Sequence, residues 1–155
     1  MNTHSTCYNS PLGQIRISEN GQSITAIKFV DAHPTQPETD ETETPLLREA
    51  VRQLSEYFGG KRQHFDLPLD QPGTGFQKRI WRALCTIPCG ETRTYGQIAV
   101  AVGCPKGARA VGMACNRNAI TIAVPCHRVI GANGKLTGYA GGLERKRQLL
   151  AIERR

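Results

Sequence analysis

Apolar and polar residues alternate most clearly near the N-terminus of this 155-residue chain. Leu12–Ser18 and Ser23–Val30 both show this period of two, which is typical of strands with one buried face. The dipeptide Asn20-Gly21 between them suits the positive φ angles of a tight hairpin turn. The pattern predicts an N-terminal β-hairpin whose apolar face the rest of the chain must cover.

The later apolar stripes have helical spacing, and three of them start at a threonine cap. Their first residues are Thr44-Pro45, Thr74-Gly75-Phe76-Gln77 and Thr94-Tyr95-Gly96-Gln97. The last two have the capping-box form, in which Gln follows Thr by three residues. Two more helices are predicted over Ala108–Arg117 and Leu143–Glu153. Loops are predicted over Asp31–Thr44, Gln63–Gly73 and Gly131–Gly142.

These elements predict an α/β (α+β) fold in two lobes, joined at Gln63–Gly73. The first, residues 1–70, is a small sheet with one helix, and the second, residues 73–155, is mostly helical. Apolar residues are 39% of the chain and 16 residues are glycine, which is in the usual range for a globular core.

Charge divides the chain at the same place. Residues 1–72 hold 6 basic and 10 acidic residues, whereas residues 73–155 hold 14 basic and 3 acidic ones. A basic half of net charge +11 favours a nucleic-acid partner over a merely soluble surface, because neutralised phosphates supply much of the affinity for nucleic acid.

The helix that starts at Thr94 and the helix over Ala108–Arg117 form a helix-turn-helix candidate. Arg109 lies near the N-terminus of the second helix. An ordinary helical hairpin is the alternative.

No apolar run approaches the roughly 18 residues that a membrane span needs, and Met1–Ser10 has no hydrophobic signal region. We therefore expect a soluble, cytoplasmic protein. The six cysteines form no C-x-x-C pair and fit no common zinc spacing, so we expect neither disulfides nor a metal. They are Cys7, Cys85, Cys89, Cys104, Cys115 and Cys126.

The segment Pro125-Cys126-His127-Arg128 carries the most reactive chemistry. A thiol attacks as its thiolate, neighbouring basic groups lower its pKa from about 8.5, and His accepts a proton near neutral pH. Adjacent residues on a strand face opposite ways, so Cys126 and His127 can couple only past a turn or through a water. Glu153, one of three acids in the basic half, is the candidate that orients His127.

The run Pro125–Ile130 (PCHRVI) resembles the active-site motif of the O6-alkylguanine-DNA alkyltransferases. Further segments resemble that family in the same order, namely Phe76-Gln77, Trp81, Ile87-Pro88, Gly90-Glu91-Thr92, Thr94-Tyr95-Gly96, Ala108–Gly112, Asn118 and Thr137–Gly142. The resemblance is dense over residues 74–153. It is thin in the first lobe, where it rests on Ser10-Pro11-Leu12-Gly13.

The resemblance implies a ribonuclease-H-like first lobe and a winged helix-turn-helix second lobe. It implies irreversible transfer of a methyl or alkyl group from O6 of guanine, with O4 of thymine left open, to a cysteine of the protein. The partner would be double-stranded DNA containing O6-alkylguanine, and no cofactor is implied. We expect a monomer that is consumed in one turnover, and cooperative binding on DNA is left open.

The resemblance also assigns catalytic roles. Cys126 would accept the alkyl group, His127 would take its proton through a water, and Glu153 would polarise His127. Tyr95 would help to rotate the nucleotide and would protonate the leaving guanine. Asn118 would stabilise the turn that leads to the active-site segment.

Two further groups of residues follow from the resemblance. The DNA surface would comprise Arg109, Ala108, Ala110, Gly112, Arg117 and Arg128. Arg109 would fill the gap left by the flipped nucleotide, and the small residues would allow close approach to a minor groove. The substrate pocket would comprise Val129, Tyr139, Ala140, Gly141 and Trp81, with Tyr139 and the following glycines closing it and the backbone near Val129 reading the guanine.

Some positions depart from the family pattern. Ala119 stands where members usually have Pro, and Ala140 stands where some animal members have Ser. The segment Met113–Arg117 also differs and brings Cys115 near the DNA face, where we expect it to pack.

Two alternatives to alkyl transfer stay open. One is a lesion-binding alkyltransferase-like protein without transfer, a type that usually lacks the acceptor cysteine, and the other is a plain winged-helix regulator.

Overall fold

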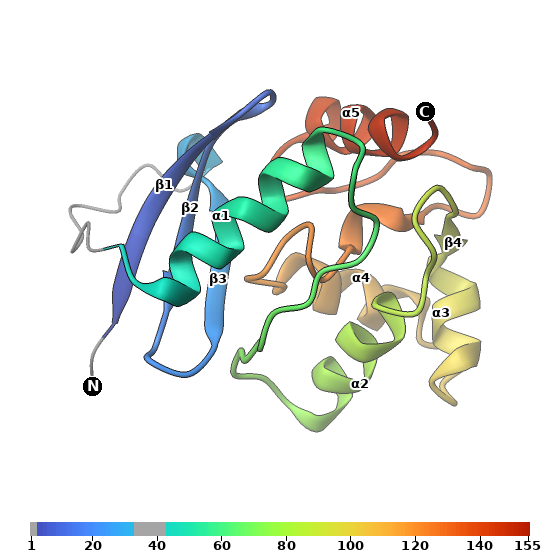
Figure 1. The fold of residues 1–155 in the computed structure, drawn as a ribbon. Coiled ribbons are helices and arrows are strands. Elements are labelled where there is room, and N and C mark those ends of the chain that lie inside the picture. Colours follow the sequence, from blue (N-terminus) through green and yellow to red (C-terminus); the bar gives the residue numbers. More distant parts are fainter. Residues whose placement is uncertain (1–2, 33–42) are drawn as a thin grey trace.

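A three-stranded antiparallel sheet forms the N-terminal part of the protein (Figure 1). The computed structural model describes residues 3–32 and 43–155. The strands are β1 (His4–Ser10), β2 (Gly13–Glu19) and β3 (Ile24–Phe29), in that spatial order. The predicted hairpin is confirmed as β2–β3, and the Asn20 side chain accepts hydrogen bonds from the backbone of Gln22 and Ser23, which closes its turn.

Strand β1 was not predicted, since its sequence HSTCYNS lacks an apolar alternation. It nevertheless pairs with β2 along its whole length, from His4 opposite Glu19 to Ser10 opposite Gly13. Backbone pairing with an amphipathic neighbour therefore overrides weak strand propensity here. A short 3-10 helix, η1 (Val30–Ala32), follows β3, and the rest of the loop predicted over Asp31–Thr44 lies mainly at residues 33–42, outside the described residues.

Helix α1 (Pro45–Phe58) packs across the sheet and begins at the predicted cap (Figure 1). Thr44 Oγ1 accepts from the Leu47 amide and donates to Glu19 Oε2 at 2.7 Å, so one residue caps the helix and ties it to β2. Leu47, Leu54 and other apolar residues of α1 are buried against the sheet. The prediction of this helix is confirmed.

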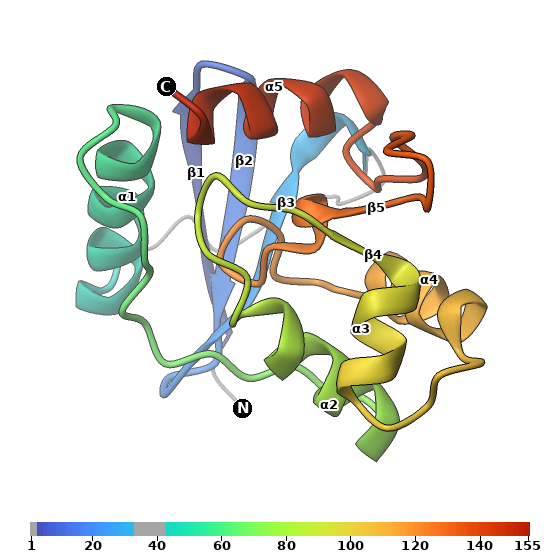
Figure 2. The same ribbon diagram turned by 90° about the vertical axis from the view of Figure 1, so that its right-hand side faces the viewer.

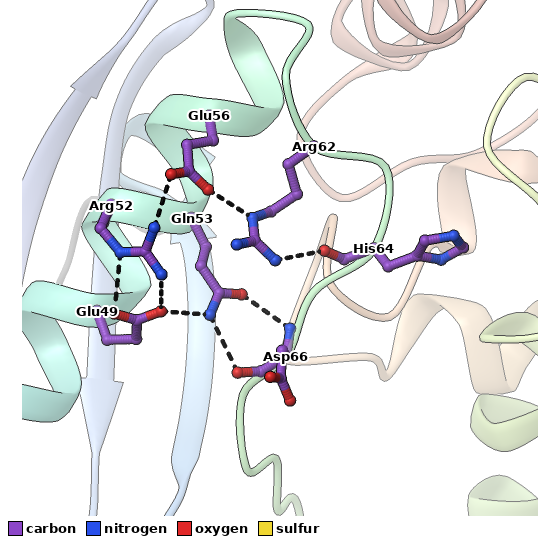
Figure 3. Close-up of polar contacts among 7 residues, drawn as sticks. All are labelled: Glu49, Arg52, Gln53, Glu56, Arg62, His64 and Asp66. Carbon is purple, nitrogen blue, oxygen red and sulfur yellow. Dashed lines mark hydrogen bonds and ion pairs between the residues drawn. The ribbon is translucent and has the colours of Figure 1, made fainter.

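The chain after α1 is fastened to the helix that it leaves (Figure 3). The Gln53 amide donates to the Asp66 carbonyl at 3.0 Å and accepts from the Asp66 amide at 2.8 Å. Arg62 pairs with Glu56 at 2.8 Å and donates to the His64 carbonyl at 2.9 Å. The position of the C-terminal turn of α1 is therefore fixed by the connection as well as by the sheet.

The C-terminal part is mostly helical and contains the predicted helix-turn-helix pair (Figure 2). Its elements are α2 (Gly75–Leu84), β4 (Arg93–Thr94), α3 (Tyr95–Ala101), α4 (Ala108–Asn116), η2 (Cys126–Arg128), β5 (Val129–Ile130) and α5 (Leu143–Glu153). Both predicted capping boxes are present, at Thr74 and Thr94. The short strands β4 and β5 pair in parallel.

Helix α5 and the segment after α4 join this part to the sheet. On α5, Arg145 lies 4.3 Å from the Phe29 ring and pairs with Asp31 at 2.7 Å. The Ile27 amide donates to the Ala119 carbonyl, so the chain after α4 continues the hydrogen bonding of β3. Among residues 3–32 and 43–155, no helix combines the length and apolar character required to cross a membrane.

Candidate active site

A tight turn delivers Cys126 to the interior. Ile122 has a φ of 72°, the one positive value at a non-glycine residue in the described parts of the chain, and the backbone then winds into η2. Asn118 holds this turn from within, because its Nδ2 donates to the Val124 carbonyl at 2.8 Å and its Oδ1 accepts from the Ile120 amide at 3.1 Å. The geometry agrees with the turn-stabilising role expected for Asn118.

Ala119, which stands where family members usually have Pro, is hydrogen-bonded to Gln71 in the connection between the lobes. Gln71 Nε2 donates to Asn118 Oδ1 at 2.9 Å, and the Ala119 amide donates to Gln71 Oε1 at 2.8 Å. Gln71 and Asn118 are both buried. A proline at position 119 has no N–H to give, so Gln71 and Ala119 belong together in this chain.

Glu153 lies against His127, as the sequence led us to expect. His127 Nε2 donates to Glu153 Oε2 at 2.6 Å, and both side chains are fully buried. Arg128 donates to both oxygens of the carboxylate, at 2.8 and 3.0 Å, and Tyr57 of α1 donates to Oε2 at 2.5 Å. The carboxylate is therefore surrounded by donors.

These contacts set the protonation states of the pair. Burial acts to raise the pKa of Glu153, but hydrogen bonds from His127, Arg128 and Tyr57 hold it well below its usual range. Burial lowers the pKa of His127 although Glu153 opposes the shift, so its imidazole is neutral at pH 7. With Nε2 donating to a carboxylate, Nδ1 carries the lone pair. This buried Nδ1 has no hydrogen-bond partner among the described residues, so it is free to act as a base.

Cys126 is buried, and that burial raises the pKa of its thiol, with Asn118 and Lys146 acting in the opposite direction. Sequence reasoning emphasised the neighbours that lower a thiol pKa, but in the folded chain desolvation outweighs them. The resting thiol is therefore protonated, and it needs a base when it reacts. Lys146, which sequence reasoning placed on an ordinary basic helix, is buried and donates to the Thr137 carbonyl at 2.6 Å.

The segment at residues 137–142 lies next to this cluster. The Tyr139 ring meets the His127 ring edge-on at 6.5 Å between centroids, and its buried hydroxyl has no partner among the described residues. A Cβ at Gly141 would lie 3.0 Å from the rings of both Phe29 and Tyr139, so a side chain here would require these rings to shift. Thr137 donates to the Tyr95 hydroxyl at 3.0 Å, which brings Tyr95 to the same segment.

The other residues predicted to line the substrate pocket differ in how deeply they are buried. Val129 is fully buried and pairs with Arg93, and its amide donates to the Cys126 carbonyl. Ala140 is exposed. Trp81 is buried under α4, and its indole donates to the Ala114 carbonyl at 2.9 Å, so its place in the substrate pocket stays a prediction.

The structure exposes most of the residues predicted for the DNA surface on α4 but buries Arg128. Arg109, Ala110 and Arg117 are exposed, while Ala108 and Gly112 are partly exposed. Arg128 is 5% exposed, and its guanidinium is occupied by Glu153 and the Ile87 carbonyl. Assigning it to DNA contact was wrong, because position in the motif does not reveal burial.

Cys115 of α4 is half-buried, and burial raises its pKa to about 12. Such a thiol is a poor nucleophile at neutral pH. The packing role expected for Cys115 therefore agrees with its surroundings.

Changing Ala119→Pro is expected to lower the free energy of unfolding by about 1–3 kcal/mol, because Gln71 Oε1 becomes a buried acceptor without a donor. This cost exceeds the gain of about 0.4–1 kcal/mol from a stiffer unfolded chain. Equilibrium urea unfolding measures it. Combining Ala119→Pro with Gln71→Leu should cost less than the two single losses added together, whereas strict additivity would show that the two residues are not coupled.

Two family models match nearly the whole chain. The 6-O-methylguanine DNA methyltransferase ribonuclease-like domain matches residues 3–71, and the DNA binding domain of the same name matches residues 75–155. A methylated-DNA--protein-cysteine methyltransferase of Mycolicibacterium paratuberculosis is 52% identical over 95% of this chain and 90% of that protein. A constitutive one of Bacillus subtilis is 51% identical over 99% and 96%.

Solved structures agree with these sequence matches. The crystal structure of Mycobacterium tuberculosis O6-methylguanine methyltransferase superposes with a TM-score of 0.90 at 46% identity, covering 99% of this chain and 93% of that one. The structure of the same organism's OGT in complex with DNA gives 0.89 at 47% identity, covering 97% and 92%. Since family models, relatives and folds all agree over nearly the full length, this chain belongs to the 6-O-methylguanine DNA methyltransferase family.

Proposed function

We propose that the protein repairs DNA by moving a methyl or larger alkyl group from O6 of guanine to Sγ of Cys126, once per molecule. One observation carries this proposal: a buried thiol adjoins a buried, neutral His127 whose Nε2 is held by Glu153. Membership of the family supports it independently.

The proton path follows from the tautomer of His127. Nδ1 accepts the thiol proton through a bridging water, and the imidazolium that forms faces the ionised Glu153. Sγ then attacks the alkyl carbon in line, a C–S bond forms and the C–O bond breaks. Tyr95, whose pKa burial raises, stays protonated and supplies the proton to the leaving guanine. The thioether is stable, so each molecule reacts once.

Burial of the thiol requires the damaged base to leave the helix. Cys126 is 6% exposed, and a base stacked inside a duplex cannot reach it. Extrusion costs a few kcal/mol, which an inserted side chain offsets. Arg109, exposed at the second position of α4, is the residue that we assign to this insertion.

Several finer assignments belong to the same proposal. We assign one lobe to residues 1–70 and another to 73–155, a division supported by family models that meet between residues 71 and 75. The partner is duplex DNA carrying O6-alkylguanine, bound by a monomer in the cytoplasm. No cofactor is required, since nucleophile, base and proton donor are all side chains of the chain.

A labelled methyl group on guanine O6 tests the function directly. The protein is incubated with the modified duplex, and the label is located by peptide mass spectrometry. Label on the Cys126 peptide, in a one-to-one yield, is the expected result. Tight binding without transfer would instead indicate a lesion-binding relative, and indifference to the lesion would indicate a winged-helix regulator.

Changing Arg109→Ala is expected to slow repair of methylated duplex by about 10–100-fold, because the cavity left by the flipped nucleotide stays unfilled. Reaction with free O6-benzylguanine, which needs no flipping, should change by less than about threefold. Single-turnover rates on both substrates measure the difference. As a control, Arg117→Ala removes an exposed charge at the other end of α4 and should weaken binding in a salt-dependent way. Equal losses of Arg109→Ala on both substrates would contradict the insertion role.

A further inference from the structure

Tyr57 connects the N-terminal lobe to the reaction centre. We propose that it is a positioning residue for alkyl transfer, because its hydroxyl fixes the Glu153 oxygen to which His127 is bonded. This inference rests on the proposed function. It gives the first lobe a part in the chemistry, because Tyr57 acts through Glu153 and His127.

The geometry at Glu153 Oε2 is the basis of the inference. The Tyr57 hydroxyl lies 2.5 Å from this oxygen, and His127 Nε2 lies 2.6 Å from it. Arg128 donates to Oε1 at 2.8 Å and, more distantly, to Oε2 at 3.0 Å. Tyr57 and Glu153 are 96 residues apart in sequence, and their helices α1 and α5 lie side by side at these ends (Figure 1).

Tyr57 is committed to donating. Burial, reinforced by Glu153, raises the pKa of its hydroxyl far above neutral pH, so the proton stays on the phenol. Oε2 thus receives hydrogens from Tyr57 and His127 at short range and from Arg128 at 3.0 Å. Each donor weakens the pull of the oxygen on the others. The Tyr57 hydroxyl therefore keeps the carboxylate from making His127 too basic, which leaves Nδ1 unprotonated at neutral pH.

Other charged groups face this pair from every side. Glu153 raises the pKa of His127, whereas burial, Arg128 and Lys146 lower it. Cys89 and Tyr139 also lie within electrostatic reach of Glu153. Because Glu153 favours the protonated imidazole, a change at Tyr57 that strengthens the pull of this carboxylate must raise the pKa of His127.

The surroundings of Tyr57 allow its hydroxyl to be removed alone. Its ring packs edge-on against Phe58 at 5.1 Å between centroids, and it packs at a tilt against Phe65 at 5.5 Å. The same turn of α1 is held by Glu56 and Gln53, which bond to the chain after the helix (Figure 3). Tyr57→Phe keeps these contacts and deletes one oxygen.

The decisive experiment compares Tyr57→Phe with Tyr8→Phe, which removes a hydroxyl from the same aromatic cluster. Single-turnover transfer to methylated duplex is measured between pH 5.5 and 9, together with an NMR titration of the His127 imidazole. For Tyr57→Phe we expect the acidic limb and the His127 titration to move up by about 0.5–1 pH unit, with rates reduced by the corresponding factor of about 3–10 at pH values well below the pKa of His127. Rates at pH 9 should agree within about twofold, and Tyr8→Phe should match the parent.

A second substitution is expected to shift the His127 titration in the opposite direction. Placing 3-fluorotyrosine at position 57 keeps the ring and makes the phenol a stronger donor, so the limb and the His127 titration should move to lower pH. Unchanged profiles for both substitutions would overturn the inference and leave Tyr57 a packing residue. Failure of the parent protein to transfer at any pH would overturn the proposed function instead, while the His127 titration would still report on Tyr57.

Discussion

Cys126→Ser is expected to abolish alkyl transfer while leaving binding to the methylated duplex largely intact. A serine hydroxyl is far less acidic than a thiol, and a neutral imidazole such as that of His127 cannot ionise it enough for attack on an alkyl carbon. The loss should be at least about a thousandfold in rate, the range associated with losing both nucleophile and base function. Transfer of the labelled methyl and duplex binding, measured on the same preparation, test both halves.

Cys115→Ala is the matched control, because it removes the other thiol that interacts electrostatically with Cys126. Its pKa of about 12 leaves almost no thiolate at neutral pH, so this variant should transfer at close to the parent rate. Label on the Cys115 peptide, or residual transfer by Cys126→Ser, would show that the acceptor was misassigned. Loss of lesion binding in Cys126→Ser would show that the thiol also shapes the pocket.

Elements whose limits depend on local chemistry could be predicted from the sequence. Thr44, Thr74 and Thr94 cap helices because a side-chain oxygen and a nearby amide suffice, and all three caps are present. Strand β1 could not be found in this way, since its polar sequence forms a strand only through pairing with β2. The signal for β1 is in its partner and not in its own residues.

In the candidate site, too, the residues marked by local sequence could be predicted and those placed by long-range contacts could not. The motif around Cys126 and the scarcity of acids in the basic half were enough to select His127 and Glu153. Contacts across large sequence separations were not visible, and Tyr57 and Gln71 were missed for that reason. Arg128 was misassigned because a basic residue beside a reactive cysteine can equally serve DNA or a buried carboxylate, and only burial distinguishes the two.

Glu153→Gln is expected to lower the free energy of unfolding at pH 7 by about 3–5 kcal/mol, as well as to slow transfer. Removing one member of a buried ion pair leaves the other uncompensated, and Arg128 is 5% exposed with Glu153 as its charged partner. The pKa of Glu153 is depressed in the folded state, so its contribution is fully present above the unfolded value near 4.5 and is lost progressively as the pH falls from there through the folded value. Urea unfolding at pH 7 and pH 3.5 measures both effects.

Two further variants test whether the loss of stability comes from the buried ion pair or from the removal of any acidic residue. Glu144→Gln, on the exposed first turn of α5 beside Arg147, should change stability little, because a surface ion pair contributes little. Glu153→Gln combined with Arg128→Met should recover much of the stability, since neither buried charge then lacks a partner, but it should not recover transfer. If the double variant were no more stable than Glu153→Gln alone, the loss would come from the lost bonds to His127 and Tyr57 and not from the unpaired guanidinium of Arg128.

The difference in unfolding free energy between parent and Glu153→Gln should be smaller at pH 3.5 than at pH 7. An equal difference at both pH values would contradict the depressed pKa of this carboxyl.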